Sequence, residues 1–185
     1  MSDLSETEVV ARAQRGEAEA AGLLYEAHQA AIFRYLWFRL GEREIAEDLT
    51  GDVFVRMLEA LPRYRPSATP FRAWLYRIAR NLAIDHGRRA GHAPPVALEE
   101  VAASHDPADD PAHQVDPRLS LEALRAALAG LEAGQREVVT LRFLAGLSLR
   151  ETAAVVNKTE AAVKAMQHRG LTALNQALNQ EQRHL

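Results

Sequence analysis

A basic, aromatic-rich stretch over residues 70–89, PFRAWLYRIARNLAIDHGRR, has the side-chain types that bind nucleic acid. Cationic side chains neutralise phosphates, and flat rings stack on unpaired bases. These charges and rings belong to Arg72, Arg77, Arg80, Arg88, Arg89, Phe71, Trp74 and Tyr76. Apolar residues recur every three to four positions, at Phe71, Leu75, Ile78 and Leu82, which predicts a helix with that stripe in a core. The opposite face is either a solvated basic surface or a nucleic-acid site.

The segment before this stretch has the opposite charge. Residues 42–60 carry six acids and two Arg, whereas residues 61–92 carry seven Arg and one acid, although the net charge of the chain is only −3. Glu47, Asp48 and Asp52 lie on a predicted helix whose apolar side is expected to include Leu58. These acids form either a solvated helix surface or a docking face for a basic or mixed protein surface.

A second candidate site lies near the C-terminus. Residues 147–171, LSLRETAAVVNKTEAAVKAMQHRGL, are typical of a helix-turn-helix, although plain helical bundles also contain paired short helices. Ser148 with Glu151 predicts a capping box, and Thr159 predicts the next N-cap. The second helix of such a motif enters the major groove with its first turns. The side chains expected to contact DNA are Thr159, Glu160, Lys164, His168 and Arg169, and Gln167 is expected to be exposed as well.

Helices must position both candidate sites. Apolar spacing predicts a short helix ending near Gly16, a helix over 17–40 ending at Gly41 and a third over 43–61 ending at Pro62. Residues 93–117 hold five of the eight prolines and six acids, which predicts a flexible linker with a reach of about 80 Å. Because no alternating strand pattern occurs, we expect an all-α protein with helical domains over 1–92 and 118–185.

The sequence also argues against several classes of protein. It has no Cys, so disulfides and thiolate metal sites are excluded and a reducing cytoplasm is the expected location. The seven His show no ligand spacing with carboxylates, and phosphate-binding loops and hydrolase motifs are missing. We therefore expect no metal, no cofactor and no enzymatic activity. No apolar run approaches 18 residues, and the N-terminus is polar, so neither membrane insertion nor a signal peptide is expected.

Taken together, three segments resemble the extracytoplasmic-function (ECF) sigma factors of bacterial RNA polymerase over nearly the whole chain. Residues 46–65, AEDLTGDVFVRMLEALPRYR, look like the second conserved region of that family, with Gly51 where the family usually has Gln. Residues 70–89 look like the adjoining segment that melts the promoter and reads the −10 element. Residues 131–171 are similar to the fourth region, which reads the −35 element.

The resemblance implies a bacterial, cytoplasmic factor that binds core polymerase and directs promoter recognition and melting. Its N-terminal domain would dock on the clamp coiled coil of the β′ subunit, and its C-terminal domain would sit on the β flap. The matching docking positions are Glu47, Asp48, Leu49, Asp52, Val53 and Phe54. Asn81 would capture a flipped base of the single-stranded −10 element, and the strand would be held by Trp74, Arg77, Arg80, Arg88 and Arg89.

Residues 159–169 would read double-stranded −35 DNA, and the linker would then span about 50–70 Å, a couple of duplex turns. The resemblance also implies an anti-sigma partner. Two other interpretations stay open from the residues alone. A free-standing helix-turn-helix regulator would bind duplex DNA tightly without polymerase, and an adaptor that binds polymerase alone would not need clustered arginines beside aromatics.

Overall fold

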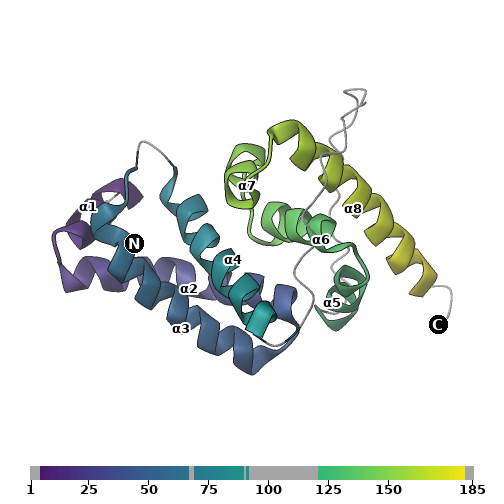
Figure 1. Ribbon diagram of the computed structural model, residues 1–185, viewed down its shortest axis with the longest axis horizontal. Helices are drawn as coiled ribbons and strands as arrows, with labels where there is room; N and C mark the ends of the chain where they lie inside the picture. The colour runs from purple at the N-terminus through teal and green to yellow at the C-terminus, as the bar shows by residue number, and fades with distance from the viewer. Residues whose placement is uncertain (1–4, 67–68, 90, 92–120, 182–185) are drawn as a thin grey trace.

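The computed structural model describes residues 5–66, 69–89, 91 and 121–181, and the regular elements in these ranges are helical. The N-terminal elements are α1 (Glu6–Gln14), α2 (Ala18–Leu40), α3 (Arg43–Ala60), the 3₁₀ turn η1 (Leu61–Arg63) and α4 (Phe71–Arg89). The C-terminal elements are α5 (Leu121–Ala129), α6 (Ala133–Val139), the π-helical turn η2 (Thr140–Leu144), α7 (Leu149–Val156) and α8 (Glu160–Glu181). Figure 1 shows the two groups side by side, with α4 and α7 at their junction. The predicted all-α fold is confirmed, and the expected linker over 93–117 lies outside the described residues.

Helix ends follow the local signals in the sequence. Ser5 and Glu8 form a capping box at α1, and Ser148 and Glu151 form another at α7. Gly41 ends α2 in the left-handed region, with φ of +83°, which costs glycine little because it has no Cβ. The basic helix α4 begins at Phe71, and the Pro70 carbonyl accepts the first helical hydrogen bond from the Trp74 amide at 3.0 Å.

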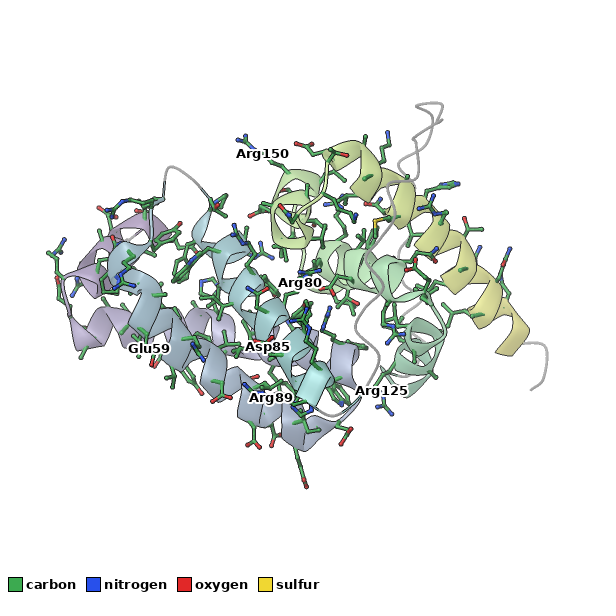
Figure 2. The ribbon with its side chains drawn as sticks, in the orientation of Figure 1. Glu59, Arg80, Asp85, Arg89, Arg125 and Arg150 are labelled. Carbon is green, nitrogen blue, oxygen red and sulfur yellow. The ribbon has the colours of Figure 1, made fainter. Side chains whose placement is uncertain are left out.

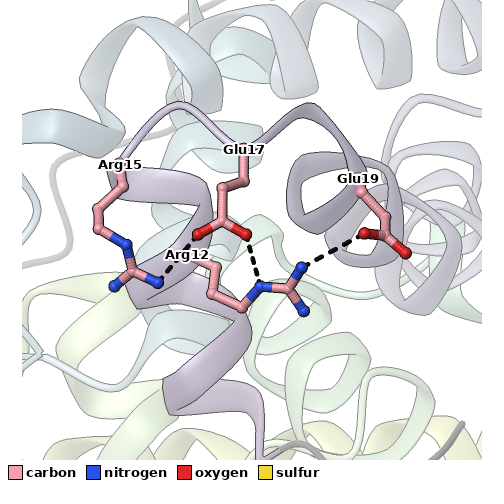
Figure 3. Close-up of polar contacts among 4 residues, drawn as sticks. All are labelled: Arg12, Arg15, Glu17 and Glu19. Atoms are coloured by element: carbon pink, nitrogen blue, oxygen red, sulfur yellow. Dashed lines mark hydrogen bonds and ion pairs between the residues drawn. The ribbon is translucent and has the colours of Figure 1, made fainter.

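Ion pairs fix the corner between α1 and α2. Arg12 pairs with Glu17 at 2.7 Å and with Glu19 at 3.3 Å, while Arg15 pairs with Glu17 at 2.9 Å (Figure 3). The hydrogen bond from Arg12 holds the pKa of the Glu17 carboxyl below its usual value. From the end of α1, the Gln14 amide donates to the carbonyls of Leu61 and Tyr64, both at 3.0 Å. Helix α1 therefore supports the chain that leads from α3 towards α4.

The helices α2, α3 and α4 pack around a shared apolar core. Phe71 and Leu75 are buried as the stripe in α4 predicts, whereas Ile78 and Leu82 are half-buried. Tyr76 is also buried, with 1% of its surface exposed, although it lies outside that stripe. Its burial has a tertiary cause, because its ring packs edge-on against Tyr35 of α2 at a centroid distance of 5.4 Å.

The N-terminal and C-terminal helices share an interface that the sequence did not indicate. Helix α4 packs on α7, and α2 packs on both η2 and α5. Phe38 of α2, 5% exposed, belongs to the same apolar cluster as Leu128 of α5. Two arginine side chains add polar links: Arg72 of α4 donates to the Ala145 carbonyl, and Arg125 of α5 donates to the Gly41 carbonyl at 2.5 Å. In this structure the two helical groups are therefore packed together.

Candidate nucleic-acid and polymerase interfaces

One face of α4 presents polar side chains to solvent. Arg77 and Asn81 are exposed one helical turn apart, and Arg88 and Arg89 continue the exposed surface at the C-terminal end of the helix. Asp85 lies on this surface too, 4.0 Å from Arg88. Figure 2 shows Asp85 and Arg89 along the C-terminal half of α4. The structure therefore brings together Arg77, Asn81, Arg88 and Arg89, as expected from the sequence.

The aromatic side chains of α4 differ in their access to a ligand. Phe71 and Tyr76 are buried, 4% and 1% exposed, so neither ring is available for base stacking; for Phe71 this agrees with its place in the predicted core stripe. Trp74 is half-buried in a cluster with Tyr64, at a ring-centroid distance of 4.7 Å, and Phe71, at 5.7 Å. The Tyr64 hydroxyl donates to the Thr69 carbonyl at 2.7 Å, which ties this cluster to the loop before α4. Of Phe71, Trp74 and Tyr76, Trp74 alone is more than marginally exposed.

Arg80 does not share the exposed face of Asn81. Its side chain is half-buried and points towards the C-terminal helices, with Nε 3.9 Å from the Oε1 atom of Glu137 in α6 (Figure 2). Burial lowers the pKa of the Arg80 guanidinium, an effect that nearby Arg39 reinforces. Arg80 was expected beside the other DNA-binding arginines, but helical geometry turns it about 100° away from Asn81, since each residue of an α-helix advances by 1/3.6 of a turn.

The polymerase-docking residues expected in α3 fall into two sets. Glu47, Asp48 and Asp52 are exposed, and Arg43 forms an ion pair with Glu47 at 2.8 Å. Three others are buried in the core and cannot contact a partner directly: Leu49, Val53 and Phe54, which are 8%, 0% and 5% exposed. Their apolar side chains hold α3 in place, so they support a docking face rather than form it.

Two apolar residues of α3 belong to the outer face instead. Val55 is 56% exposed and Leu58 is 50% exposed, although Leu58 was expected on the buried side. The spacing of Asp48, Asp52 and Val55, at i, i+4 and i+7, places them on one side of the helix. The same spacing could have identified Val55 from the sequence, because Val53, Phe54 and Met57 already fill the inward side. We call Glu47, Asp48, Asp52, Val55 and Leu58 the α3 outer face.

The helix-turn-helix has the predicted geometry. Thr159 caps α8 by accepting from the Ala162 amide at 3.2 Å, and Asn157 makes the turn in the left-handed region with φ of 56°. The predicted DNA-reading residues at the start of α8 are all exposed: Thr159, Glu160, Lys164, His168 and Arg169. Gln167 was expected to be exposed but is 9% exposed. Its side chain accepts a hydrogen bond from Arg142 at 2.9 Å, so it anchors α8 to η2 rather than facing DNA.

Two further features of the described residues bear on function. Among them, no group of three His, Cys, Asp or Glu could hold a metal ion. No helix in the described ranges is long and apolar enough to cross a membrane.

Known proteins share both halves of this arrangement. The family description "Sigma-70 region 2" matches residues 24–93, and "Sigma-70, region 4" matches residues 121–174. The ECF RNA polymerase sigma factor SigD of Mycobacterium tuberculosis is 35% identical over 170 residues, which cover 90% of this chain and 80% of SigD. The chain is an ECF sigma factor of the sigma-70 family. The ECF sigma factor BldN of Streptomyces coelicolor is 39% identical over 176 residues, covering 95% of this chain and 67% of BldN.

Solved structures share this fold. The structure of CnrH in complex with the cytosolic domain of CnrY aligns with a TM-score of 0.70 at 29% identity, covering 92% of this chain and 95% of that one. The sigma factor RpoE from Bartonella quintana, in complex with the anti-sigma factor NepR, aligns with a TM-score of 0.64 at 22% identity, over 85% of this chain and 96% of that one. As an ECF sigma factor, the chain binds core RNA polymerase and directs promoter recognition. Sigma factors are initiation factors rather than enzymes.

Proposed function

We propose that the α3 outer face is the surface that docks on the clamp coiled coil of the polymerase β′ subunit. Asp48 and Asp52 supply charge for a basic or mixed partner, and Val55 and Leu58 supply apolar area that water now covers. Exposed apolar side chains beside charged ones are typical of protein interaction sites. In this proposal Leu49, Val53 and Phe54 contribute by holding the helix, not by touching the polymerase.

The face of α4 that carries Asn81 binds the melted −10 strand. Asn81 takes a flipped base, because a side-chain amide can both donate to and accept from a Watson–Crick edge. Arg77, Arg88 and Arg89 surround it and neutralise phosphates, and the accessible part of Trp74 offers a stacking surface. The observation that carries this proposal is the exposure of Asn81 between cations on a helix that packs directly on the docking helix α3.

The helix-turn-helix supplies the second anchor, on the −35 duplex and the β flap. Helix α8 presents Lys164 one turn after Glu160, while His168 and Arg169 reach the sugar–phosphate backbone. The Arg142–Gln167 hydrogen bond fixes the orientation of α8 against the preceding turn. The boundaries proposed for the two anchors are residues 1–92 and 118–185, with 93–117 as the connection.

The chain acts in the bacterial cytoplasm and has no catalytic activity of its own in this proposal. An anti-sigma factor is its expected regulator. This expectation is supported by two proteins of similar fold: CnrH, solved in complex with the cytosolic domain of CnrY, and the sigma factor RpoE, solved in complex with the anti-sigma factor NepR.

The substitution Asn81→Ala tests the −10 site. We expect promoter opening by the reconstituted holoenzyme, followed with permanganate footprinting, to fall roughly tenfold or more, since extruding a base costs a few kcal/mol that its pocket must recover. Binding to core polymerase should be unchanged. Gln176→Ala, which removes an exposed amide from α8, is the matched control. Equal losses of opening and core binding, or no loss of opening, would refute the role of Asn81.

A further inference from the structure

A buried carboxylate joins the two helical groups. The Glu137 side chain of α6 is 7% exposed. The Tyr35 hydroxyl donates to its Oε1 atom at 2.5 Å, and Arg39 forms an ion pair with its other oxygen. Arg80 of α4 lies 3.9 Å away. All three partners belong to α2 or α4, so every one of these contacts crosses the interface between the N-terminal and C-terminal helices.

This arrangement makes the burial of Glu137 depend on the packed state. A carboxylate loses its hydration when it is buried, and only close partners compensate for that loss. If the two helical groups separate, Glu137 becomes exposed to water. Arg39 and Arg80 then lose their contacts with its carboxylate. The N-terminal surface would then expose two additional cations beside α4. Phosphate is the ligand that such a surface fits.

The proposed function requires this separation. Simultaneous contact with the −10 and −35 elements needs the two anchors to lie about 50–70 Å apart, a couple of duplex turns. Here α4, which carries the −10 site, packs directly on α7, the first helix of the helix-turn-helix. The packed state therefore cannot engage both promoter elements.

The interface is also incompletely filled beside Glu137. A cleft of about 630 Å³ lies between α2 and α4 on one side and α6, α7 and α8 on the other. Its lining includes Arg80, Arg136 and Glu137. The side chains around this cleft lack part of the dispersion contacts that a tightly packed core provides. Such an interface can open without unfolding either helical group.

We propose that the packed arrangement is an autoinhibited state of the free sigma factor and that Glu137 is its latch, which occupies Arg39 and Arg80 in place of strand phosphates. The inhibition rests on the proposed function, in which α4 binds the −10 strand through the Asn81 face, and it adds Arg80 to the phosphate contacts once the interface opens. Asn81 stays exposed in the packed state. The latch therefore competes for phosphate contacts and leaves the base-reading side chain accessible.

Two variants in the full chain test the latch. Glu137→Gln removes the charge at constant shape, and Tyr35→Phe removes a hydrogen bond from the other side of the interface. Because the chain has no Cys, fluorophores can be attached at Glu59→Cys in α3 and Gln176→Cys in α8, both exposed positions. Energy transfer between them reports the opening of the interface. Glu26→Gln, an exposed acid of α2, is the control, and circular dichroism checks that each variant is folded.

The binding probe is a fluorescein-labelled single-stranded DNA of random sequence, without polymerase. We expect Glu137→Gln to lower energy transfer and to bind the strand roughly tenfold more tightly, because loss of the buried ion pair shifts the population towards the open state. The slope of log affinity against log salt should steepen by about 0.7 for each added phosphate contact. Adding Arg80→Ala to Glu137→Gln should remove much of this gain, and Glu26→Gln should match the wild type.

The outcomes separate the latch from the proposed function. Folded Glu137→Gln and Tyr35→Phe variants with wild-type energy transfer would overturn the latch. Transcription by the reconstituted holoenzyme does not depend on the state of the free chain, so it would still test the sigma function independently. Lower energy transfer with unchanged strand affinity would overturn the inhibition and, with it, the proposed role of Arg80.

Discussion

Gly170 makes a close crossing between α8 and α6 possible, and adding one methyl group there should destabilise the protein. A Cβ at this position would lie 2.8 Å from Val139 Cγ2 and 3.3 Å from Gln135 Cβ. Val139 is 3% exposed and β-branched, so its side chain has little freedom to move away. Overpacking a core costs about 1–3 kcal/mol, whereas Gly→Ala inside a helix gains about 1 kcal/mol. We therefore expect Gly170→Ala to lower the free energy of unfolding by about 1 kcal/mol, and by at most about 2 kcal/mol.

Gly51 provides a matched control in α3. It is exposed, and a Cβ added there would meet no atom within 4 Å, so Gly51→Ala should gain the full helix-propensity difference of about 1 kcal/mol. Urea unfolding followed by circular dichroism measures both variants, and their difference isolates the clash. Gly170→Ala should also weaken binding to −35 duplex DNA, because α8 must shift. If Gly170→Ala stabilises the protein as much as Gly51→Ala, the close crossing of α8 and α6 is refuted.

Two other substitutions test separate parts of the structure. Val55→Asp and Leu58→Asp should each weaken binding to core polymerase roughly tenfold, because each puts an unpaired charge where the docked complex would bury apolar surface. Circular dichroism should stay unchanged, and wild-type affinity in both variants would remove these residues from the docking face. Glu6 accepts a hydrogen bond from His28, which lowers the pKa of its carboxyl below the usual value. A carboxyl whose pKa is lower in the folded than in the unfolded state stabilises the fold at pH values above its unfolded-state pKa. This contribution is lost as the pH falls through its folded-state pKa. The stability difference between wild type and Glu6→Gln should therefore shrink on acidification in a series of urea titrations, and a difference that stays constant would contradict the ion pair.

Local signals predicted the helices well because their causes lie within a few residues. The capping boxes at Ser5 and Ser148, the left-handed Gly41 and the N-cap at Thr159 all depend on neighbours along the chain. The exposed set around Asn81 also followed from helical spacing. These features need no knowledge of how distant segments pack.

The misplaced residues share a different cause, which is contact between segments far apart in the sequence. Tyr76 and Arg80 looked like ligands for nucleic acid, but Tyr76 packs against Tyr35 of α2 and Arg80 lies 3.9 Å from Glu137 of α6. Gln167 looked exposed, yet Arg142 draws it into the interface between α8 and η2. Polar and aromatic side chains tolerate both environments, so their type alone does not reveal burial.

Leu58 shows the limit of apolar periodicity within one helix. The pattern in α3 placed it on the inward side, because neighbouring Val53, Phe54 and Met57 are apolar too. The inward arc is already filled by those side chains, and Leu58 lies beyond it. Apolar residues in excess of what a core can hold therefore mark a surface, here the one proposed for the polymerase.

Run-off transcription from a genomic promoter library tests the sigma function most directly. Purified core polymerase would be assayed with the chain, without it, and with the chain carrying Asn81→Ala. The structure and the proposed sites predict new, discrete transcripts that depend on the chain and weaken with Asn81→Ala. Transcripts that are the same with and without the chain, while the chain binds duplex DNA tightly by itself, would contradict the sigma function and favour a free-standing helix-turn-helix regulator.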